Sequence, residues 1–211
     1  MKRSNLWVAA AAAPAVAGLV VLVAMGIGSV VSAEIIYDNL QNVTGRYFGT
    51  PLEVGDEVTL AGTAREVTEF RVILYAPAPV TIDPSLNFYE NDGPLGEPQT
   101  WIWGATWLDV SFESVQTLIF PIPNVLVPDT FTWTFTSTHP SAGVLLNDPP
   151  TVGSSGDYVW TYEAGAWTAS DFGGDPVANL AARIDAAPEP ATLCLLGAGL
   201  AGLAVRRIRR K

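Results

Sequence analysis

The residues between 34 and 187 that could do chemistry are mainly carboxylates and indoles. His139 is the only histidine of the chain, it precedes Pro140, and no G-x-S-x-G nucleophile elbow occurs. A serine-histidine-aspartate triad or a histidine-based zinc site therefore lacks the partners that it would need. Two carboxylates at a suitable separation could hydrolyse a glycoside. Because this region has so many acids, some pair always lies close together, and proximity alone is therefore no evidence for such a site. We therefore expect no catalytic residues and no enzymatic activity, with a carboxylate glycoside hydrolase as the weakest alternative.

The stretch Glu90-Asn91-Asp92-Gly93 offers the oxygen atoms that Ca²⁺ prefers. The same residue types are also typical of a plain Asp-Gly hairpin turn, because they tolerate positive φ. The turn is the favoured interpretation. We expect no cofactor, with calcium bound by Glu90, Asn91 and Asp92 as the alternative.

Six tryptophans lie in this part of the chain, and exposed indoles bind sugar rings. Trp101 and Trp103 are two residues apart, which places both on one face of an extended strand. They are the candidate platform for a glycan, although packing in the core is the ordinary fate of tryptophan in a β-sandwich. The other four indoles belong to Trp107, Trp133, Trp160 and Trp167.

The charge of this region limits its partners. The whole chain has a net charge of −10, but residues 34–187 have four arginines and no lysine against twenty Asp and Glu, which is a net charge of −16. Such a field repels phosphate backbones and anionic lipids, so nucleic acid is excluded as a partner. No cysteine lies in this region, so its stability must come from a packed core rather than from an internal disulfide.

The elements that must position these side chains are strands. Period-2 alternation is plainest in 130–136, where aromatic residues and threonines point to opposite sides, and we expect a half-buried antiparallel strand there. No convincing amphipathic helix separates the strand signals, so they predict an all-β, antiparallel β-sandwich or jelly roll. The expected strands are 34–40, 57–62, 67–76, 85–90, 100–112, 115–122, 130–138, 143–147, 157–163 and 178–186.

The first 33 residues have the pattern of a secretory signal. Lys2 and Arg3 precede an almost wholly apolar stretch, and Val31-Ser32-Ala33 has small residues where signal peptidase cuts. We expect a signal helix removed by cleavage after Ala33, which leaves 34–187 as the exported domain. A permanent N-terminal membrane anchor is the alternative, since the apolar stretch is long enough to span a bilayer.

The last 24 residues combine three unlike features. Pro188-Glu189-Pro190 cannot begin a continuous helix comfortably, so it is expected to be an extended handle. An uncharged segment follows at 191–205; as a helix it would reach about 22 Å, which spans a bilayer if basic side chains snorkel and the bilayer thins locally. A basic cluster then retains the end in the cytoplasm, and it consists of Arg206, Arg207, Arg209, Arg210 and Lys211.

This order of features resembles the PEP-CTERM sorting signal of Gram-negative bacteria. The resemblance implies processing near Pro188-Glu189-Pro190 by exosortase, a membrane-embedded cysteine transpeptidase, in bacteria that produce exopolysaccharide and form biofilms. A plain C-terminal membrane anchor is the alternative. The exported part is similar to the choice-of-anchor β-sandwich domains, which have no established activity; the similarity rests on residues 36–40, 70–75, 86–94 and 178–184.

Together these features predict a protein exported across the inner membrane, tethered by its C-terminal helix and then delivered to the cell surface or extracellular matrix. Its expected partners are signal peptidase and exosortase as processing enzymes, and extracellular polysaccharide. The expected function is non-enzymatic. The alternative is a carbohydrate-binding or Ca²⁺-assisted adhesive module of the same fold.

Overall fold

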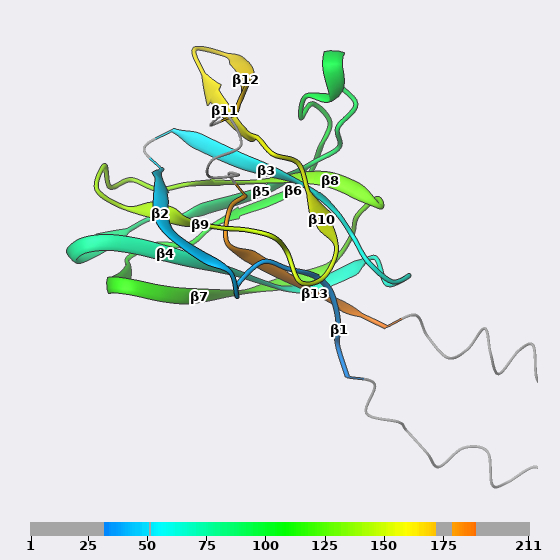
Figure 1. Cartoon of the computed structure of the whole chain (residues 1–211), viewed down its shortest axis with the longest axis horizontal. Helices are drawn as coiled ribbons and strands as arrows, with labels where there is room; N and C mark the ends of the chain where they lie inside the picture. The colour runs from blue at the N-terminus through cyan, green and yellow to red at the C-terminus, as the bar shows by residue number, and fades with distance from the viewer. Residues whose placement is uncertain (1–31, 51, 172–178, 189–211) are drawn as a thin grey trace, which may run out of the picture. The chain divides into compact units, whose positions relative to one another are not determined.

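A computed structural model describes residues 32–50, 52–171 and 179–188 of the chain. These residues form two antiparallel sheets and one short 3₁₀ turn, η1 (Pro94–Gly96) (Figure 1). The six-stranded sheet contains β1 (Glu34–Asp38), β2 (Val43–Gly49), β4 (Glu66–Ile82), β7 (Val110–Leu126), β9 (Gly143–Asn147) and β13 (Ala182–Ala187). The seven-stranded sheet contains β3 (Glu53–Thr59), β5 (Ser85–Tyr89), β6 (Trp101–Thr106), β8 (Thr130–Thr136), β10 (Ser154–Ser155), β11 (Val159–Glu163) and β12 (Ala166–Ser170).

The two sheets pack face to face around an aromatic core. Phe70 of β4 lies 4.9 Å from Trp133 of β8 and 5.9 Å from Phe88 of β5, measured between ring centroids, and all three side chains are fully buried. Because β4 belongs to one sheet and β5 and β8 to the other, these contacts join the sheets. The predicted all-β sandwich is therefore confirmed, as is the β-sandwich expected from the resemblance to choice-of-anchor domains.

The predicted strands agree with the structure where alternation is strong and differ where turns intervene. The expected strand 143–147 coincides with β9, but the expected strand 100–112 is two strands, β6 and the start of β7. Asp109, with φ of 55°, lies in the connection, and its backbone N–H donates to Asp83 Oδ1 at 2.9 Å. Strands β2, β10 and β12 were not expected, because their sequences contain glycine or small polar residues without an apolar alternation.

Strand β8 corrects one expectation. Its aromatic residues point into the core as predicted, but Thr132 and Thr134 on the opposite side are also fully buried. The hydroxyl of Thr132 donates to Asn91 Oδ1 at 2.7 Å, and the hydroxyl of Thr134 donates to Glu53. The outer face of this sheet is therefore covered along its middle strand, and β8 is buried on both sides rather than half-buried.

Besides Glu53 of β3, the cover comes from two projections on the same side of the seven-stranded sheet. One is the β11–β12 hairpin, and the other is the loop between β5 and β6, which contains η1 (Figure 1). The hairpin turns at Ala164 and Gly165, and both have positive φ (53° and 87°), as a two-residue type I′ turn requires.

Residues 1–31 of the predicted signal, the predicted C-terminal transmembrane helix and the whole basic cluster lie outside the described residues. Within the described residues, no helix has the length and hydrophobicity needed to cross a membrane.

Candidate functional site

The two tryptophans of the predicted glycan platform point in different directions. Strand β6 pairs with β5 through Phe88↔Trp103 and Tyr89↔Trp101, with a register shift between these pairs. Trp103 therefore follows Phe88 into the core, with ring centroids 5.3 Å apart, whereas Trp101 lies on the outer face and is 57% exposed. The expectation that the two indoles share one face is wrong, because the β-bulge adds a residue between them.

The predicted calcium ligands organise the β5–β6 loop. Asp92 accepts hydrogen bonds from the backbone N–H and the hydroxyl of Thr100 at 2.8 and 2.6 Å, and these bonds lower the pKa of the Asp92 carboxyl. Asn91 accepts its bond from Thr132 instead, and Glu90 is exposed. Asn91 and Asp92 therefore have different partners, and no group of three or more His, Cys, Asp or Glu that could hold a metal occurs in the described part of the chain. The favoured Asp-Gly turn is wrong in its expected backbone, because Gly93 has φ of −76° and the positive φ values of this loop occur at Leu95 and Gly96. Calcium at this loop stays the untested alternative.

His139 belongs to a turn after β8. Its Nδ1 accepts a hydrogen bond from the backbone N–H of Ser141 at 3.2 Å, and its carbonyl accepts one from Ala142 at 3.2 Å. Both contacts are local, which fits a structural role for this side chain.

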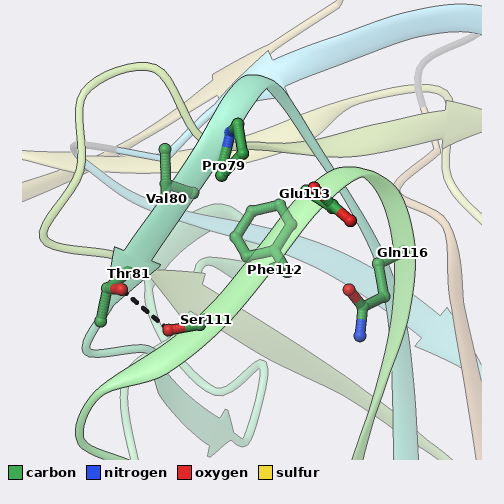
Figure 2. A pocket seen from close by; sticks show the side chains of 7 residues that line it. All are labelled: Pro79, Val80, Thr81, Ser111, Phe112, Glu113 and Gln116. Atoms are coloured by element: carbon green, nitrogen blue, oxygen red, sulfur yellow. Dashed lines mark hydrogen bonds between the residues drawn. The ribbon is translucent and has the colours of Figure 1, made fainter.

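The sandwich has a hollow of about 430 Å³ where the β4–β7 ribbon changes register between Ala76 and Val80. Figure 2 shows Phe112 at the centre of this hollow and the hydroxyls of Thr81 and Ser111 joined by a hydrogen bond of 2.8 Å. Phe112 is buried, and the two hydroxyls satisfy each other. The exposed side chains of Glu113 and Gln116 are the other polar groups of its lining.

A second cavity, of about 450 Å³, lies between the β11–β12 hairpin and the β5–β6 loop. We call it the hairpin cleft. Three aromatic rings dominate its lining, and one carboxylate, Glu97, belongs to it. Its lining residues are Leu95, Glu97, Tyr158, Trp160, Trp167, Thr168 and Ala169.

The register of the sheet turns Trp160 toward this cleft. Trp160 pairs with Gly55 of β3, whose neighbour Val54 is fully buried in the core. Successive residues of a strand point to opposite faces, so Gly55 and Trp160 both belong to the outer face. A side chain at Gly55 would have its Cβ 2.9 Å from Thr134 Cγ2, and glycine is therefore required for the packing beneath the cleft.

The hairpin folds back over the outer face of the sheet. Trp167 of β12 packs edge-on against Tyr89 of β5 at 5.8 Å between ring centroids, although three strands separate β12 from β5 in the sheet order. Trp167 also contacts Tyr162 at 4.9 Å. These contacts fix the indole of Trp167 between the sheet and the cleft.

Two half-buried tyrosines bind acids on the same face. The hydroxyl of Tyr89 donates to Glu53 at 3.3 Å, and burial, followed by the charge of Glu53, raises the pKa of Tyr89 to about 12. Tyr158 is hydrogen-bonded to Glu57, and burial, followed by that charge, likewise raises its pKa to about 12. Both phenols therefore stay neutral at physiological pH and keep these carboxylates on the outer face.

One donor in the lining has no acceptor. Trp160 is only 6% exposed, it packs edge-on against Tyr158 at 5.5 Å, and its Nε1 has no hydrogen-bond partner among the described residues. A buried unpaired donor costs about 1–3 kcal/mol. Unpaired groups of this kind in native structures often mark a place for a ligand or a water molecule.

The sequence singled out Trp101 and Trp103 and missed the residues that line this cleft. Trp160 and Trp167 flank the Ala-Gly turn of an aromatic hairpin, and this turn was a signal that could have found them. Glu97 and Leu95 come from a loop about sixty residues earlier, and no local pattern connects them with the hairpin.

The described residues therefore form an antiparallel β-sandwich with an aromatic cleft on the outer face of one sheet. Comparison with known families matches residues 186–210 to the PEP-CTERM protein-sorting motif. The chain therefore has a PEP-CTERM sorting motif, and this motif implies export and sorting by exosortase toward the cell surface with a membrane-anchored stage. No curated protein and no solved structure matches the chain.

The matched motif begins inside the folded domain. Ala186 and Ala187 are the last residues of β13, and Ala186 is buried and pairs with Val67 of β4 and Glu34 of β1. Pro188, the first residue of the predicted handle, follows directly and is the last described residue there. Glu189, Pro190 and the basic cluster lie outside the described residues.

Proposed function

We propose that this protein is a non-enzymatic carbohydrate-binding protein of the cell surface or extracellular matrix. The observation that supports the proposal best is the hairpin cleft, in which Tyr158, Trp160 and Trp167 converge. Flat aromatic rings accept the apolar faces of sugar rings, and a few polar groups around them orient the ligand. Extracellular polysaccharide is the carbohydrate that an exported, surface-sorted protein meets first.

The chemistry of the lining favours binding over hydrolysis. Glycoside hydrolysis by the common mechanisms needs two carboxyl groups on either side of the scissile bond. Glu97 is the only carboxylate in the described lining of the cleft. Glu53, the acid nearest to Trp167 through Tyr89, accepts hydrogen bonds from Asn87, Tyr89 and Thr134, all at Oε1. In the proposed binding site, Glu53 holds the Tyr89 side chain beneath Trp167.

The test compares two tryptophans of the same sheet face. The full chain, purified in detergent, is titrated with soluble oligosaccharides and with exopolysaccharide from the expressing cells, and binding is measured by calorimetry. We expect Trp167→Ala to weaken binding about tenfold, because stacking on one indole is worth about 0.5–1.5 kcal/mol beyond the apolar area that it buries. Trp101→Ala is the matched control, since Trp101 is exposed on the same face but does not line the cleft.

Two outcomes would contradict the proposal. Equal loss of binding in Trp101→Ala and Trp167→Ala would mean that the carbohydrate binds to a surface outside the hairpin cleft. Release of reducing ends from any bound saccharide, abolished by Glu97→Gln, would make the protein a hydrolase. The thermal unfolding of each variant is measured in parallel, so that loss of fold is distinguished from loss of binding.

A further inference from the structure

The four arginines of the exported region all lie away from the hairpin cleft. Arg46, Arg71 and Arg183 belong to β2, β4 and β13 of the six-stranded sheet. Arg65 lies in the connection from β3 to β4, where it donates to Asp129 Oδ1 at 2.7 Å and to nearby backbone carbonyls. The strands of the seven-stranded sheet therefore have no basic side chain, and this sheet is completely described.

The acids, by contrast, gather around the cleft. Glu97 lines it, Glu57 is hydrogen-bonded to the lining residue Tyr158, and Glu53 is bonded to Tyr89 beneath Trp167. Charges within about one Debye length, roughly 8 Å at physiological salt, act on a bound ligand with little screening. An acidic polysaccharide would meet like charges here without a single cationic partner on the sheet.

Besides the hydroxyl of Thr168, the lining offers a ligand one donor and one acceptor. The donor is Trp160 Nε1, a buried N–H without an acceptor, and pairing it with a carbonyl or hydroxyl oxygen of the ligand requires the indole to shift toward the cleft. Glu97 is a half-buried carboxylate at the same cavity, and it suits an ammonium group. An amino sugar polymer that is partly N-acetylated supplies all three complements: a ring face for the indoles, an acetamido carbonyl for Trp160 and an ammonium group for Glu97.

From this arrangement we infer that the hairpin cleft binds a partly N-acetylated amino sugar polymer and discriminates against polymers of uronic acids. The inference rests on the proposed function and names its ligand class. Discrimination comes from the charge around the cleft, whereas the stacking platform itself accepts any sugar ring of suitable shape.

The experiment uses four soluble oligosaccharides of matched length and the full chain in detergent. They are partly deacetylated chitosan oligomers, fully acetylated chitin oligomers, neutral cello-oligomers and alginate oligomers. We expect the partly deacetylated oligomer to bind about tenfold more tightly than the neutral one, which is the size of one charge-assisted hydrogen bond. The alginate oligomer is expected to bind most weakly, and the preference for amino groups is expected to fall as salt rises.

Matched variants separate the cleft from the general acidity of the domain. Glu97→Gln should remove the preference for the deacetylated oligomer and leave binding of the neutral oligomer intact. Glu113→Gln should leave the preference unchanged, because Glu113 is an exposed acid at the hollow of the six-stranded sheet. Spermine, a cation without a sugar ring, gives the baseline attraction of an acidic protein for any polyamine.

Each result decides between the two proposals. If no oligosaccharide binds, the proposed function fails and this inference fails with it. If neutral oligomers bind and amino groups add nothing beyond the spermine baseline, or if alginate binds as tightly, only the inference about charge is overturned. A preference for amino groups that survives Glu97→Gln would place the recognition elsewhere and would also overturn it.

Discussion

The outer faces of the two sheets differ in how far their polar groups satisfy one another. On the six-stranded sheet, Arg183 donates two hydrogen bonds to Asp185, and Arg71 pairs with Glu69 at 2.5 Å and approaches Asp185 at 4.0 Å. On the outer side of the seven-stranded sheet, acids stand without basic partners, and the buried N–H of Trp160 has no acceptor. The six-stranded sheet pairs acids with arginines and leaves the amide oxygen of Asn147 in β9 unpaired, whereas the outer face of the seven-stranded sheet retains carboxylates that a ligand could pair. The same sandwich core thus supports one face with ion pairs and one face with a cleft, to which the proposed binding is assigned.

A small apolar cluster completes the six-stranded face. Ile73, Leu145 and Ala181 are buried together on the outside of that sheet, and Tyr47 and Tyr75 stack beside them with ring centroids 4.6 Å apart. These residues shield the strands from solvent locally. The seven-stranded face achieves the same shielding with a folded hairpin, and this solution leaves a cavity.

The largest expected effect separates the core side of strand β6 from its outer side. Trp103→Ala should lower the free energy of unfolding by about 3 kcal/mol, because the indole packs against Phe88 and the core. Trp101→Ala should change it by less than about 0.5 kcal/mol, because that indole is largely exposed. Urea denaturation of both variants gives the comparison. Equal losses would mean that the two indoles share one environment after all.

The next effect tests the ion pairs of the six-stranded face. Asp185→Ala should cost about 2 kcal/mol of stability, since it removes the buried acceptor of both Arg183 hydrogen bonds. Binding of oligosaccharide should not change, because Asp185 belongs to the other sheet. Glu69→Ala, which removes a more exposed partner, serves as the control and should cost under about 1 kcal/mol. A loss of ligand affinity in Asp185→Ala would mean that the six-stranded sheet also contributes to ligand binding.

A pH titration tests an acid that belongs to neither outer face. Asp56 of β3 is fully buried, and desolvation raises the pKa of its carboxyl well above the usual value, against hydrogen bonds from Ser155 and the backbone of Leu180. Folding therefore favours the protonated acid. Its contribution to stability is present below about pH 4 and is lost as the pH rises through the raised pKa.

Asp56→Asn should remove this dependence. Relative to the original protein, the variant should gain up to about 1.4 kcal/mol of stability per pH unit above pH 4 until the folded-state pKa is passed. Chemical denaturation at several pH values measures the difference in slope, which is independent of the fixed cost of the substitution. A difference that stays constant with pH would mean that Asp56 is charged in the folded protein, with Tyr37 and Glu57 as its titratable neighbours.

The smallest effect on stability is expected at the cleft. Trp160→Phe removes the unpaired N–H and some packing volume, and these changes oppose each other, so the free energy of unfolding should change by less than about 1 kcal/mol. Affinity for the acetylated oligomer should nevertheless fall several-fold, because its acceptor oxygen loses a donor. Calorimetry and urea denaturation of the same preparation separate the two quantities. Unchanged affinity would remove Trp160 Nε1 from the recognition.

The success of the sequence-based predictions depends on how local their physical basis is. Strand β8 could be predicted because the alternation of Phe131, Trp133 and Phe135 with threonines already implies one apolar face. Burial of the threonine face of β8 could not be predicted, since it depends on Asn91 and Glu53, which are distant in sequence. The shared face of Trp101 and Trp103 was predicted wrongly for the same reason, because a bulge is decided by pairing with β5.

Composition, charge and the C-terminal motif are properties of the chain itself. The sequence alone determined the acidic character of residues 34–187, the β-sandwich class and the PEP-CTERM signal, because each depends on residue types or on neighbours a few positions apart. Only the tertiary structure decided which indoles line a cavity and which acids lack a basic partner. The cleft joins Glu97 to Trp160 and Trp167 across several strands, and only the folding of the hairpin over the sheet brings them together.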